Sequence, residues 1–360
     1  MKIAIDISQV VYGTGVSVYV ENLVKNLLEI DRENSYILYA GILRRFGDLK
    51  KFFGSLPKSS NFQKRIFPIS PTFAHIIWNK MHVFPIDYLV GNMDIFHSSD
   101  WTQPPTRAYK VTTIHDLYQI KFPDYCDPKI VSVHRARLSW VKKEIDKVIV
   151  PSFATFNDLV DLGFQKEKIS IVAEAVDPVF RPKSQKIINK ILRKYKITKK
   201  YILSIGYSER KNSARIIEVF QNYFQKQGYL LVFTGNYPVG LNFGNSIRFL
   251  GHIPKKDLPA LYSGATVLLY PSIYEGFGLP VLEAFACKCP VVTSNTSSLP
   301  EVGKGGAVLV DPYSVDSIAD GVLKVIKKRR SLVDKGIKKI KSFSWRKTAM
   351  ETLKVYNRMF

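Results

Sequence analysis

The 360-residue sequence predicts an α/β protein with two doubly wound domains, each a parallel sheet covered by helices. Short apolar runs alternate with longer amphipathic runs, which is the pattern of strands joined by crossover helices. This alternation occurs on both sides of a strongly basic stretch at 181–200. The length also exceeds that of one ordinary core. We therefore predict two domains, with the boundary near residue 180.

The elements of the first half follow in order along the chain. A helix is expected in "VSVYVENLVKNLLEI" (16–30), where apolar residues recur at a helical spacing. Strands are expected where a short apolar run stands between polar or glycine residues. These runs are "KIAIDI" (2–7), "SYILYA" (35–40), "MDIFHSS" (93–99), "KVTTIHD" (110–116) and "DKVIVPS" (146–152).

The second half repeats this alternation. Its predicted strands are "KYILSIG" (200–206), "YLLVFTG" (229–235), "SIRFLG" (246–251), "TVLLYPS" (266–272) and "PVVTSN" (290–295). Ligands of doubly wound sheets bind beyond the carboxyl ends of the strands, so a cleft between the two domains is the expected site.

A dinucleotide-binding dehydrogenase would have the same fold class. Its fingerprint needs three glycines after the first strand. The sequence has Gly13 and Gly15, but Val18 stands at the third position, so the pattern fails.

The formal net charge of +23 is concentrated in two segments. Residues 181–200 carry nine basic and no acidic residues, and residues 321–360 carry 13 basic and two acidic residues. Such patches can attract an anionic membrane surface or nucleic acid, or they can simply be solvated helix faces. Nucleic acid is disfavoured because aromatic residues are not interleaved with the charges.

Several features favour the cytoplasm. The first residues are predicted to form a strand and a glycine turn instead of a signal peptide. No apolar stretch is long enough to cross a membrane. The three cysteines, Cys126, Cys287 and Cys289, have no paired metal spacing and are expected to be reduced thiols.

The stretch "SIYEGFGLPVLEA" (272–284) carries the most specific chemistry in the sequence. Glu275 follows a predicted strand, and Gly276 and Gly278 allow the backbone to approach a ligand. Pro280 suits the first turn of a helix, whose free N–H groups attract an anion such as a diphosphate. Glu283, on that helix, can accept both hydroxyls of a ribose.

Glu275, on the loop, can contact the hydroxyls of a second sugar. Two glutamates beside a phosphate-binding turn therefore predict a site for a nucleotide sugar. The alternative is purely structural, with Glu283 as a charge in the first turn of the helix and Glu275 as a solvated loop acid.

"YPSIYEGFGLPVLEA" resembles the signature of the retaining glycosyltransferases of family four, which have the two-domain GT-B fold. The resemblance extends over nearly the whole chain. It is carried by "GTGVSVYVENLVKNL", "TIHDLYQIKFPDY", "VPSFATFNDLV", "ISIVAEAVDPVFRP", "LSIGYSERKN", "FLGHIPKKDLPALYSGA", "SSLPEV" and "FSWRKTAMETLKVYNRM". It implies two Rossmann-like domains, an acceptor-binding one at 1–180 and a donor-binding one at 181–343, with a last helix at 344–360 returning to the first.

The resemblance also implies roles for individual residues. Glu283 would hold the donor ribose and Glu275 the transferred sugar. Arg210 and Lys211 would neutralise the departing diphosphate, the role that a metal plays in other transferases. Backbone groups of the glycine turn would meet the sugar and the diphosphate, at Gly276, Phe277, Gly278 and Leu279.

The resemblance implies roles for three further residues. His115, at the end of a predicted strand, would contact the transferred sugar and help to orient the reacting groups. Its alternative is a structural role, as for most single histidines at strand ends. Gly15 would bring a backbone N–H group to the diphosphate, and Ile253 would lie beside the base.

The sequence departs from the family pattern at two places. The turn before "RKN" is one residue shorter than usual, which leaves open whether Arg210 or Lys211 makes the main phosphate contact. Lys288 stands where the family usually has glycine.

The implied reaction transfers a hexose from a nucleotide-diphosphate sugar to a hydroxyl of a glycan or lipid-linked acceptor, with retention of configuration. The variants "HDL" and "ERKN" favour GDP-mannose, while UDP-glucose and other UDP-sugars stay open. No cofactor and no metal are expected, and the sequence has no Asp-any-Asp triplet. A non-catalytic sugar-nucleotide binding protein is the second alternative.

Two segments are candidates for contact with the acceptor or with lipid. "ILRRFGDLKKFF" (42–53) places Ile42, Phe46, Leu49 and Phe53 at helical spacing among basic residues, which suits an interfacial helix or a core helix with solvated charges. "RIFPISPTFAHIIWNKMHVFPIDY" (65–88) is rich in aromatic residues and could line an acceptor site or belong to the core.

Overall fold

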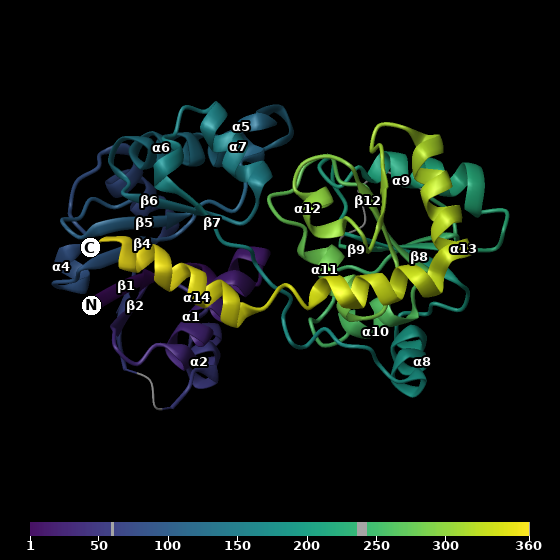
Figure 1. Ribbon diagram of the computed structural model, residues 1–360, viewed down its shortest axis with the longest axis horizontal. Helices are drawn as coiled ribbons and strands as arrows, with labels where there is room; N and C mark the ends of the chain where they lie inside the picture. Colours follow the sequence, from purple (N-terminus) through teal and green to yellow (C-terminus); the bar gives the residue numbers. More distant parts are fainter. Residues whose placement is uncertain (59–60, 236–242, 360) are drawn as a thin grey trace. The chain divides into compact units, whose positions relative to one another are not determined.

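The computed structural model of the chain describes residues 1–58, 61–235 and 243–359. They form two compact units (Figure 1). Unit 1 comprises Met1–Glu174 and Ser344–Phe360, and unit 2 comprises Ala175–Phe343. The chain therefore changes unit at Glu174, a few residues before the predicted boundary. Phe360, the last residue of the predicted return segment, lies outside the described residues.

Unit 1 is built on a seven-stranded parallel sheet with the order β3-β2-β1-β4-β5-β6-β7. Its strands are β1 (Lys2–Asp6), β2 (Ser35–Gly41), β3 (Phe62–Phe67), β4 (Ile95–Ser98), β5 (Tyr109–Thr113), β6 (Lys147–Val150) and β7 (Ile169–Ile171). The order reverses between β1 and β4, which makes the loops after these two strands the expected ligand-binding edge of a doubly wound sheet.

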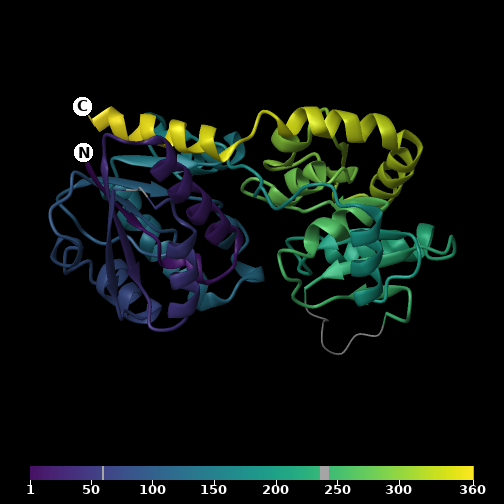
Figure 2. The ribbon, with the colours of Figure 1, turned by 90° about the horizontal axis from the view of Figure 1, so that it is seen from below.

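Helices connect and cover the strands of unit 1. They are α1 (Gly15–Ile30), α2 (Phe46–Ser55), α3 (Pro71–Ala74), α4 (Asp87–Val90), α5 (Tyr118–Lys121), α6 (Pro128–Glu144) and α7 (Phe153–Asp161), with α14 (Trp345–Tyr356) added from the end of the chain. Helix α14 packs against α1. The start of β1 and the end of α14 lie close together in both ribbon views (Figures 1 and 2).

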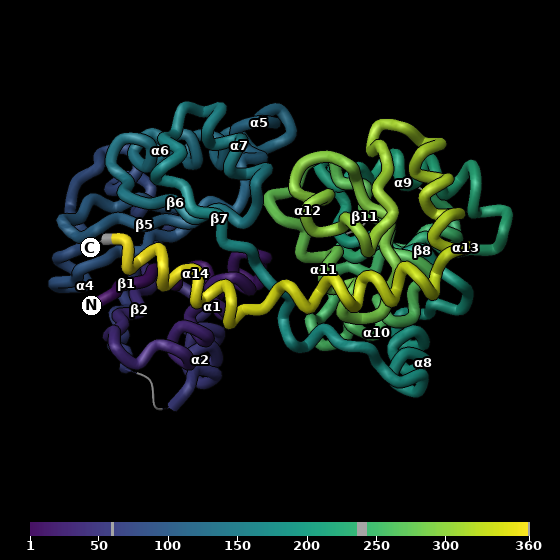
Figure 3. Tube along the Cα trace, in the orientation of Figure 1, coloured from purple at the N-terminus to yellow at the C-terminus, as the bar shows by residue number. Residues whose placement is uncertain are grey.

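Unit 2 has a six-stranded parallel sheet with the order β10-β9-β8-β11-β12-β13. The strands are β8 (Tyr201–Ile205), β9 (Leu230–Thr234), β10 (Ile247–Phe249), β11 (Val267–Tyr270), β12 (Val291–Ser294) and β13 (Val308–Val310). The helices are α8 (Gln185–Lys194), α9 (Ser213–Val219), α10 (Leu258–Gly264), α11 (Leu279–Ala286), α12 (Leu299–Gly303) and α13 (Val315–Ile340). The tube trace shows the chain running from α13 into α14 (Figure 3).

Short helical turns of other types complete the described elements. They are η1 (Ser8–Val11), η2 (His75–Lys80), η3 (Pro123–Tyr125), η4 (Lys166–Lys168), η5 (Phe220–Phe224) and η6 (Asn357–Met359).

Both faces of the unit 2 sheet are buried, which explains the continuous apolar runs of its strands. Neighbouring residues of one strand belong to different core clusters. Leu203 packs in the cluster that contains Phe277 and Val281, whereas Ile202 packs in the cluster that contains Phe220.

The strands named in the sequence analysis are all present, but three others were not predicted. These are β3, β7 and β13, each at or near an edge of its sheet. Strand β3 has four exposed central residues, "QKRI", because an edge strand with one open face needs no continuous apolar run.

The prediction of one helix over 42–53 is wrong at its start. Arg45 has φ 64° and precedes α2, which begins at Phe46. Ile42 lies outside the helix and is buried, and its N–H group donates to the carbonyl of Phe67, the last residue of β3. The buried residues of α2 are Leu49 and Phe52, so this face belongs to the core of unit 1.

In the part of the chain that the structure describes, no helix combines the length and the apolar character that crossing a bilayer requires.

Candidate active site

The glycine turn of unit 2 follows β11, at the point where the strand order reverses between β8 and β11. Gly278 forms the N-cap of α11 with φ 112°, a conformation that side-chain-bearing residues rarely adopt. A Cβ atom at Gly278 would lie 2.9 Å from Cδ2 of Leu299. Pro280 occupies the first turn of α11. Pro280 has no N–H group and the Val281 N–H donates to the carbonyl of Gly278 at 3.0 Å, so Gly278 and Leu279 supply the backbone donors for an anion at this helix start.

Two serines hold the backbone of the turn in place. Oγ of Ser297 accepts a hydrogen bond from the Glu275 N–H group at 3.0 Å. Oγ of Ser298 lies 2.8 Å from the Glu275 carbonyl oxygen and 2.9 Å from that of Phe277. The turn is thus fixed by the segment between β12 and α12 before any ligand contributes.

Glu275 is the centre of a buried ion-pair cluster. Its Oε2 accepts from a guanidinium nitrogen of Arg210 at 2.9 Å, and its Oε1 accepts from Nζ of Lys211 at 2.6 Å. The Tyr270 hydroxyl donates to the same Oε1 at 2.8 Å. Burial raises the pKa of Glu275, but Arg210 and Lys211 outweigh burial and hold this pKa at about 2. The carboxylate is ionised throughout the physiological range.

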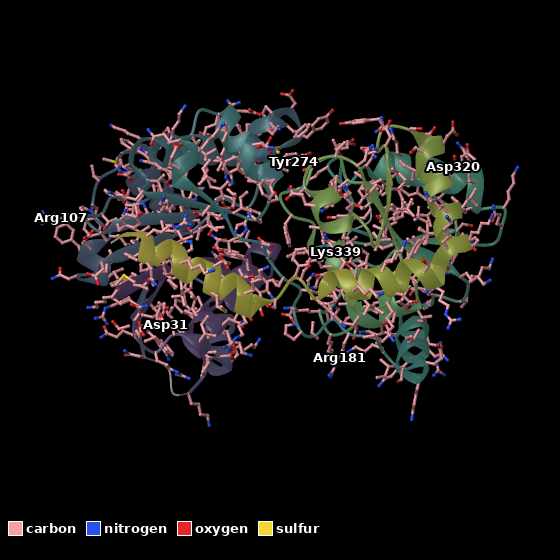
Figure 4. All side chains as sticks on the ribbon, in the orientation of Figure 1. Asp31, Arg107, Arg181, Tyr274, Asp320 and Lys339 are labelled. Carbon is pink, nitrogen blue, oxygen red and sulfur yellow. The ribbon has the colours of Figure 1, made fainter. Side chains whose placement is uncertain are left out.

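Arg210 and Lys211 come from the loop after β8. Asn212 follows them with φ 60° and donates from its amide to the carbonyls of Pro271 at 3.1 Å and Pro312 at 2.6 Å. Nε of Arg210 donates to the carbonyl of Tyr274, a residue labelled in Figure 4, at 3.0 Å. The loops after β8 and β11 are therefore tied together. Both Arg210 and Lys211 contact Glu275. The turn before "RKN", although one residue shorter than usual, therefore places both side chains at the site.

Glu283 lies one turn into α11 and is partly buried. Its Oε2 accepts from the hydroxyl of Tyr262, on α10, at 2.6 Å. Burial raises the pKa of Glu283 to about 7, against the lowering effect of the Tyr262 hydrogen bond and the Lys255 charge. The two glutamates of one turn therefore differ sharply: Glu275 is ionised, while Glu283 titrates near neutral pH.

His115 belongs to unit 1, just beyond β5. Its Nδ1 lies 2.8 Å from Oε1 of Glu174, and the ring of Tyr19 packs edge-on against it at 4.6 Å between centroids. Burial lowers the pKa of His115, but the hydrogen bond and charge of Glu174 outweigh burial and raise the pKa above its ordinary value. Gly15, also in unit 1, is the first residue of α1, behind the N-cap Thr14.

The structure brings Glu275, Arg210 and Lys211 into direct contact, with Glu283 on the adjoining helix. The side chains of Ile253 and Phe277 are buried in one core cluster, so a ligand would meet these two residues through their backbone groups. Gly276 is also buried, whereas Leu279 at the start of α11 is partly exposed. Among the described residues, no group of three or more His, Cys, Asp or Glu side chains could hold a metal ion.

Two sequence families match this chain. The family described as "Glycosyltransferase Family 4" matches residues 13–180, and "Glycosyl transferases group 1" matches residues 187–342. The O-antigen chain mannosyltransferase B of Escherichia coli is 30% identical over 281 residues, which cover 73% of this chain and 74% of that protein. The chain belongs to the family 4 glycosyltransferases.

More distant relatives of this glycosyltransferase have similar names. The MMP alpha-(1->4)-mannosyltransferase of Mycolicibacterium hassiacum is 28% identical over 235 residues, which cover 61% of this chain and 55% of that protein. The O-antigen chain mannosyltransferase RfbU of Salmonella typhimurium is 26% identical over 233 residues, or 62% of each chain.

Solved structures show the same fold, which is GT-B. Anabaena Alr3699/HepE, in complex with UDP and glucose, superposes with a TM-score of 0.72 at 14% identity and covers 99% of this chain and 100% of its own. WaaG, a glycosyltransferase involved in lipopolysaccharide biosynthesis, gives a TM-score of 0.71 at 14% identity, with 97% and 98% covered.

The structure of this glycosyltransferase adds residues that the sequence analysis did not single out. Tyr262 and Tyr270 hydrogen-bond the two glutamates of unit 2, and Glu174 contacts His115. A buried tyrosine in a strand such as "TVLLYP" looks like an ordinary core residue. Glu174, in "IVAEAVD", is an acid in an apolar run, and this is the one local signal that could have marked it.

Proposed function

We propose that this glycosyltransferase moves a hexose, with mannose favoured, from a nucleotide-diphosphate sugar to a hydroxyl of a glycan or lipid-linked acceptor, with retention of configuration and without a metal. The observation that carries the proposal is the contact of Glu275 with both Arg210 and Lys211 beside the glycine turn. It combines an acceptor of sugar hydroxyls with two basic side chains at one place.

The cations would stabilise the leaving group. The diphosphate develops negative charge as its bond to the sugar breaks, and preorganised positive groups stabilise that charge without rearrangement. Glu275 holds the guanidinium and ammonium groups in position, and the start of α11 adds backbone N–H groups. This arrangement supports transfer without a metal.

Glu283 would hold the ribose of the donor. An ionised carboxylate accepts hydrogen bonds from two adjacent hydroxyls, and the Tyr262 hydroxyl occupies only Oε2, at 2.6 Å. The Glu275 carboxylate, nearer the loop, would contact the hydroxyls of the transferred sugar. Unit 2 is thus proposed as the donor-binding domain and unit 1, with His115, as the acceptor-binding domain.

The proposed step is a front-face displacement. The bond between the anomeric carbon and the diphosphate oxygen breaks, and a bond from that carbon to the acceptor oxygen forms on the same face. The acceptor hydroxyl passes its proton to the departing phosphate oxygen. No cofactor takes part, and no covalent adduct with a side chain forms.

Mannose is favoured as the transferred sugar because three relatives are named mannosyltransferases. GDP is proposed as the donor nucleotide from the "HDL" and "ERKN" variants of the sequence. UDP-glucose or another UDP-sugar is the alternative. HepE, which is 14% identical to this chain, was solved in complex with UDP and glucose. A non-catalytic sugar-nucleotide binding protein is disfavoured by His115 and the two glutamates, all of which are present.

The first experiment is release of nucleoside diphosphate from a panel of donors by purified protein, with a chelator present and no acceptor. Slow transfer to water makes the acceptor unnecessary. We expect release from GDP-mannose and none after Glu275→Gln. Release that requires a divalent metal, or a trapped sugar on a side chain, would contradict the metal-free front-face step. Binding of a donor without release, even with acceptor extracts added, would favour the binding-protein alternative.

We further propose that the enzyme works in the cytoplasm at the inner face of the membrane. Nine of the twenty exposed large apolar side chains in the described chain fall within residues 43–88, among them Phe73, Met81 and Tyr88. Arg44, Lys50 and Lys51 are exposed in the same stretch. Exposed apolar residues next to basic ones suit an anionic lipid surface.

Vesicle sedimentation tests this membrane contact. The protein should sediment with vesicles of anionic lipid at low salt and be released as salt rises. Phe84→Ser together with Tyr88→Ser should weaken binding, while the same changes at the exposed Tyr223 and Tyr313 of unit 2 should not. An equal loss of vesicle binding in the two double variants, or no sedimentation of the wild type at low salt, would contradict the membrane contact.

A further inference from the structure

A chain of buried polar contacts surrounds His115 in unit 1. The Tyr19 hydroxyl lies 3.0 Å from Oγ1 of Thr113, and the Tyr19 ring packs edge-on against His115. Oγ1 of Thr113 lies 2.9 Å from Nε2 of His97, whose Nδ1 lies 2.7 Å from the hydroxyl of Tyr356 on α14. The His115 ring is therefore packed against a network that reaches the last helix.

Glu174 is the only described residue whose side chain hydrogen-bonds the His115 ring. Its side chain is 6% exposed, and that of His115 is 13% exposed. An ionised carboxylate can only accept hydrogen bonds, so Nδ1 of His115 must carry the proton in this contact. Nε2 is then the nitrogen that remains for a ligand.

Helix α14 contacts the backbone next to Glu174. Oγ1 of Thr348 donates to the carbonyl of Ala173, the residue just before Glu174, at 2.7 Å. Trp345, at the start of the same helix, packs against the Tyr19 ring at 6.1 Å between centroids. Helix α14 thus contacts both the backbone at Glu174 and the aromatic ring that confines His115.

We propose that Glu174 is a positioning residue for His115: its carboxylate fixes the tautomer with the proton on Nδ1 and presents Nε2 to the substrate, and α14 holds Glu174 in place through Thr348. The inference rests on the proposed role of His115 in sugar transfer. Carboxylates that accept the second N–H group of a functional histidine fix its tautomer and ring orientation in this way.

The charges around His115 set the sign of the expected effect. Its facing groups are the carboxylates of Glu174, Asp100 and Asp116, the Tyr19 ring, and His97, whose own pKa burial lowers to about 3. The three carboxylates stabilise the imidazolium form. Removing the charge of Glu174 should therefore lower the pKa of His115, while Asp100 and Asp116 remain in place.

Nitrogen-15 NMR of the histidine side chains tests the tautomer without any substrate. The chain has six histidines, and loss of one signal in His115→Gln assigns His115. We expect the neutral form of His115 to be protonated at Nδ1. In Glu174→Gln its pKa should fall, because the hydrogen bond and charge that raise it are lost. Protonation at Nε2 in the wild type, or an unchanged pKa in Glu174→Gln, would overturn the proposal.

Activity measurements separate positioning from simple support of the fold. In Glu174→Gln, kcat should fall on the order of tenfold or more with KM for the donor nearly unchanged. The limb of the kcat profile that depends on His115 should shift to lower pH by the amount that NMR gives. Glu351→Gln, which removes an exposed carboxylate of α14 paired with Lys354, is the matched control and should change neither value.

Thr348→Val keeps the proposal testable if Glu174→Gln fails to fold. The valine keeps the shape but loses the donor to Ala173, so some of the Nε2-protonated tautomer of His115 should appear. A wild-type spectrum in Thr348→Val would overturn the claim that α14 holds Glu174 in place through Thr348. If the NMR results hold but His115→Ala keeps full transfer activity, the positioning stands and the proposed role of His115 in transfer fails.

Discussion

The hydroxyl of Tyr262 donates to Oε2 of Glu283 at 2.6 Å and links α10 to α11. Burial raises the pKa of this Glu283 carboxyl group to about 7. Glu275, at the other end of the same turn, has a pKa of about 2 because Arg210 and Lys211 outweigh its burial. We therefore expect Glu283 to titrate near neutral pH and Glu275 to stay ionised over the same range.

Donor binding should weaken as the pH falls below about 7. Only ionised Glu283 can accept both ribose hydroxyls, and the protonated form must first lose its proton. The dissociation constant should rise by up to about tenfold per pH unit between pH 7 and pH 5. Calorimetry at several pH values measures it. In Glu283→Gln binding should be weaker and nearly independent of pH over this range. A wild-type pH dependence that survives in Glu283→Gln would assign the effect to another group.

Glu283 should also destabilise the fold at high pH. Its pKa rises from 4.5 in the unfolded chain to about 7 in the folded one, so the folded state binds its proton more tightly. The stabilising contribution is complete below pH 4.5 and is lost as the pH rises through 7. Glu283→Gln should therefore raise the free energy of unfolding by about 1–3 kcal/mol at pH 8 and by little at pH 4. Denaturant unfolding at both pH values measures this difference. A larger gain at pH 4 would contradict the assignment.

Glu275→Gln should nearly abolish turnover. The neutral amide keeps the shape but loses the charge that holds Arg210 and Lys211, and we expect kcat to fall on the order of a hundredfold or more. Because the pKa of Glu275 is about 2, wild-type activity should show no titration of this group above pH 4. The measurement is donor turnover across pH. Glu209→Gln, an exposed carboxylate beside Arg210, is the control and should leave kcat within about twofold of the wild type.

Gly278→Ala should disturb the glycine turn. The new Cβ would lie 2.9 Å from Leu299 at a φ of 112°, so backbone strain and overlap act together. We expect a loss of about 1–3 kcal/mol in the free energy of unfolding and weaker donor binding, because the start of α11 must move. Gly47→Ala, in α2, is the matched change without a steric neighbour and should stabilise by about 0.5–1 kcal/mol. Wild-type stability in Gly278→Ala would show that the turn accommodates a side chain.

Lys288→Gly should stabilise unit 2. Lys288 follows Cys287, the C-cap of α11, and has φ 59°. Its N–H group donates to the Phe285 carbonyl at 3.1 Å, and the Cys289 N–H group donates to the Ala284 carbonyl at 2.9 Å. This pair of bonds is the helix ending that favours glycine. The Cβ atom of the exposed lysine is strained in this left-handed conformation. Glycine should therefore raise the free energy of unfolding by about 1 kcal/mol. Lys304→Gly at the end of α12, where φ is −54°, should give no gain, and a gain there equal to that at Lys288 would contradict the argument.

Sequence reasoning predicted the long apolar strands and the chemistry of one short turn. Strands such as β8 and β11 are local apolar runs between turn residues, and the turn from Glu275 to Glu283 carries its glycines, its proline and both acids within nine consecutive positions. It did not predict β3, β7 or β13. Strand β3 is too polar for an apolar run, and β7 and β13 have only three residues each, although the equally short β10 was predicted.

The sequence by itself determined the fold class, the family resemblance and the residues of the glycine turn, because each depends on neighbours along the chain. Only the tertiary structure decided which distant residues meet. His115 and Glu174 are brought together because β5 and β7 both flank β6 and end at one edge of the sheet. Tyr262 reaches Glu283 through the packing of α10 against α11. Strand order and helix packing are properties of the whole core, so a pattern read along one segment cannot contain them.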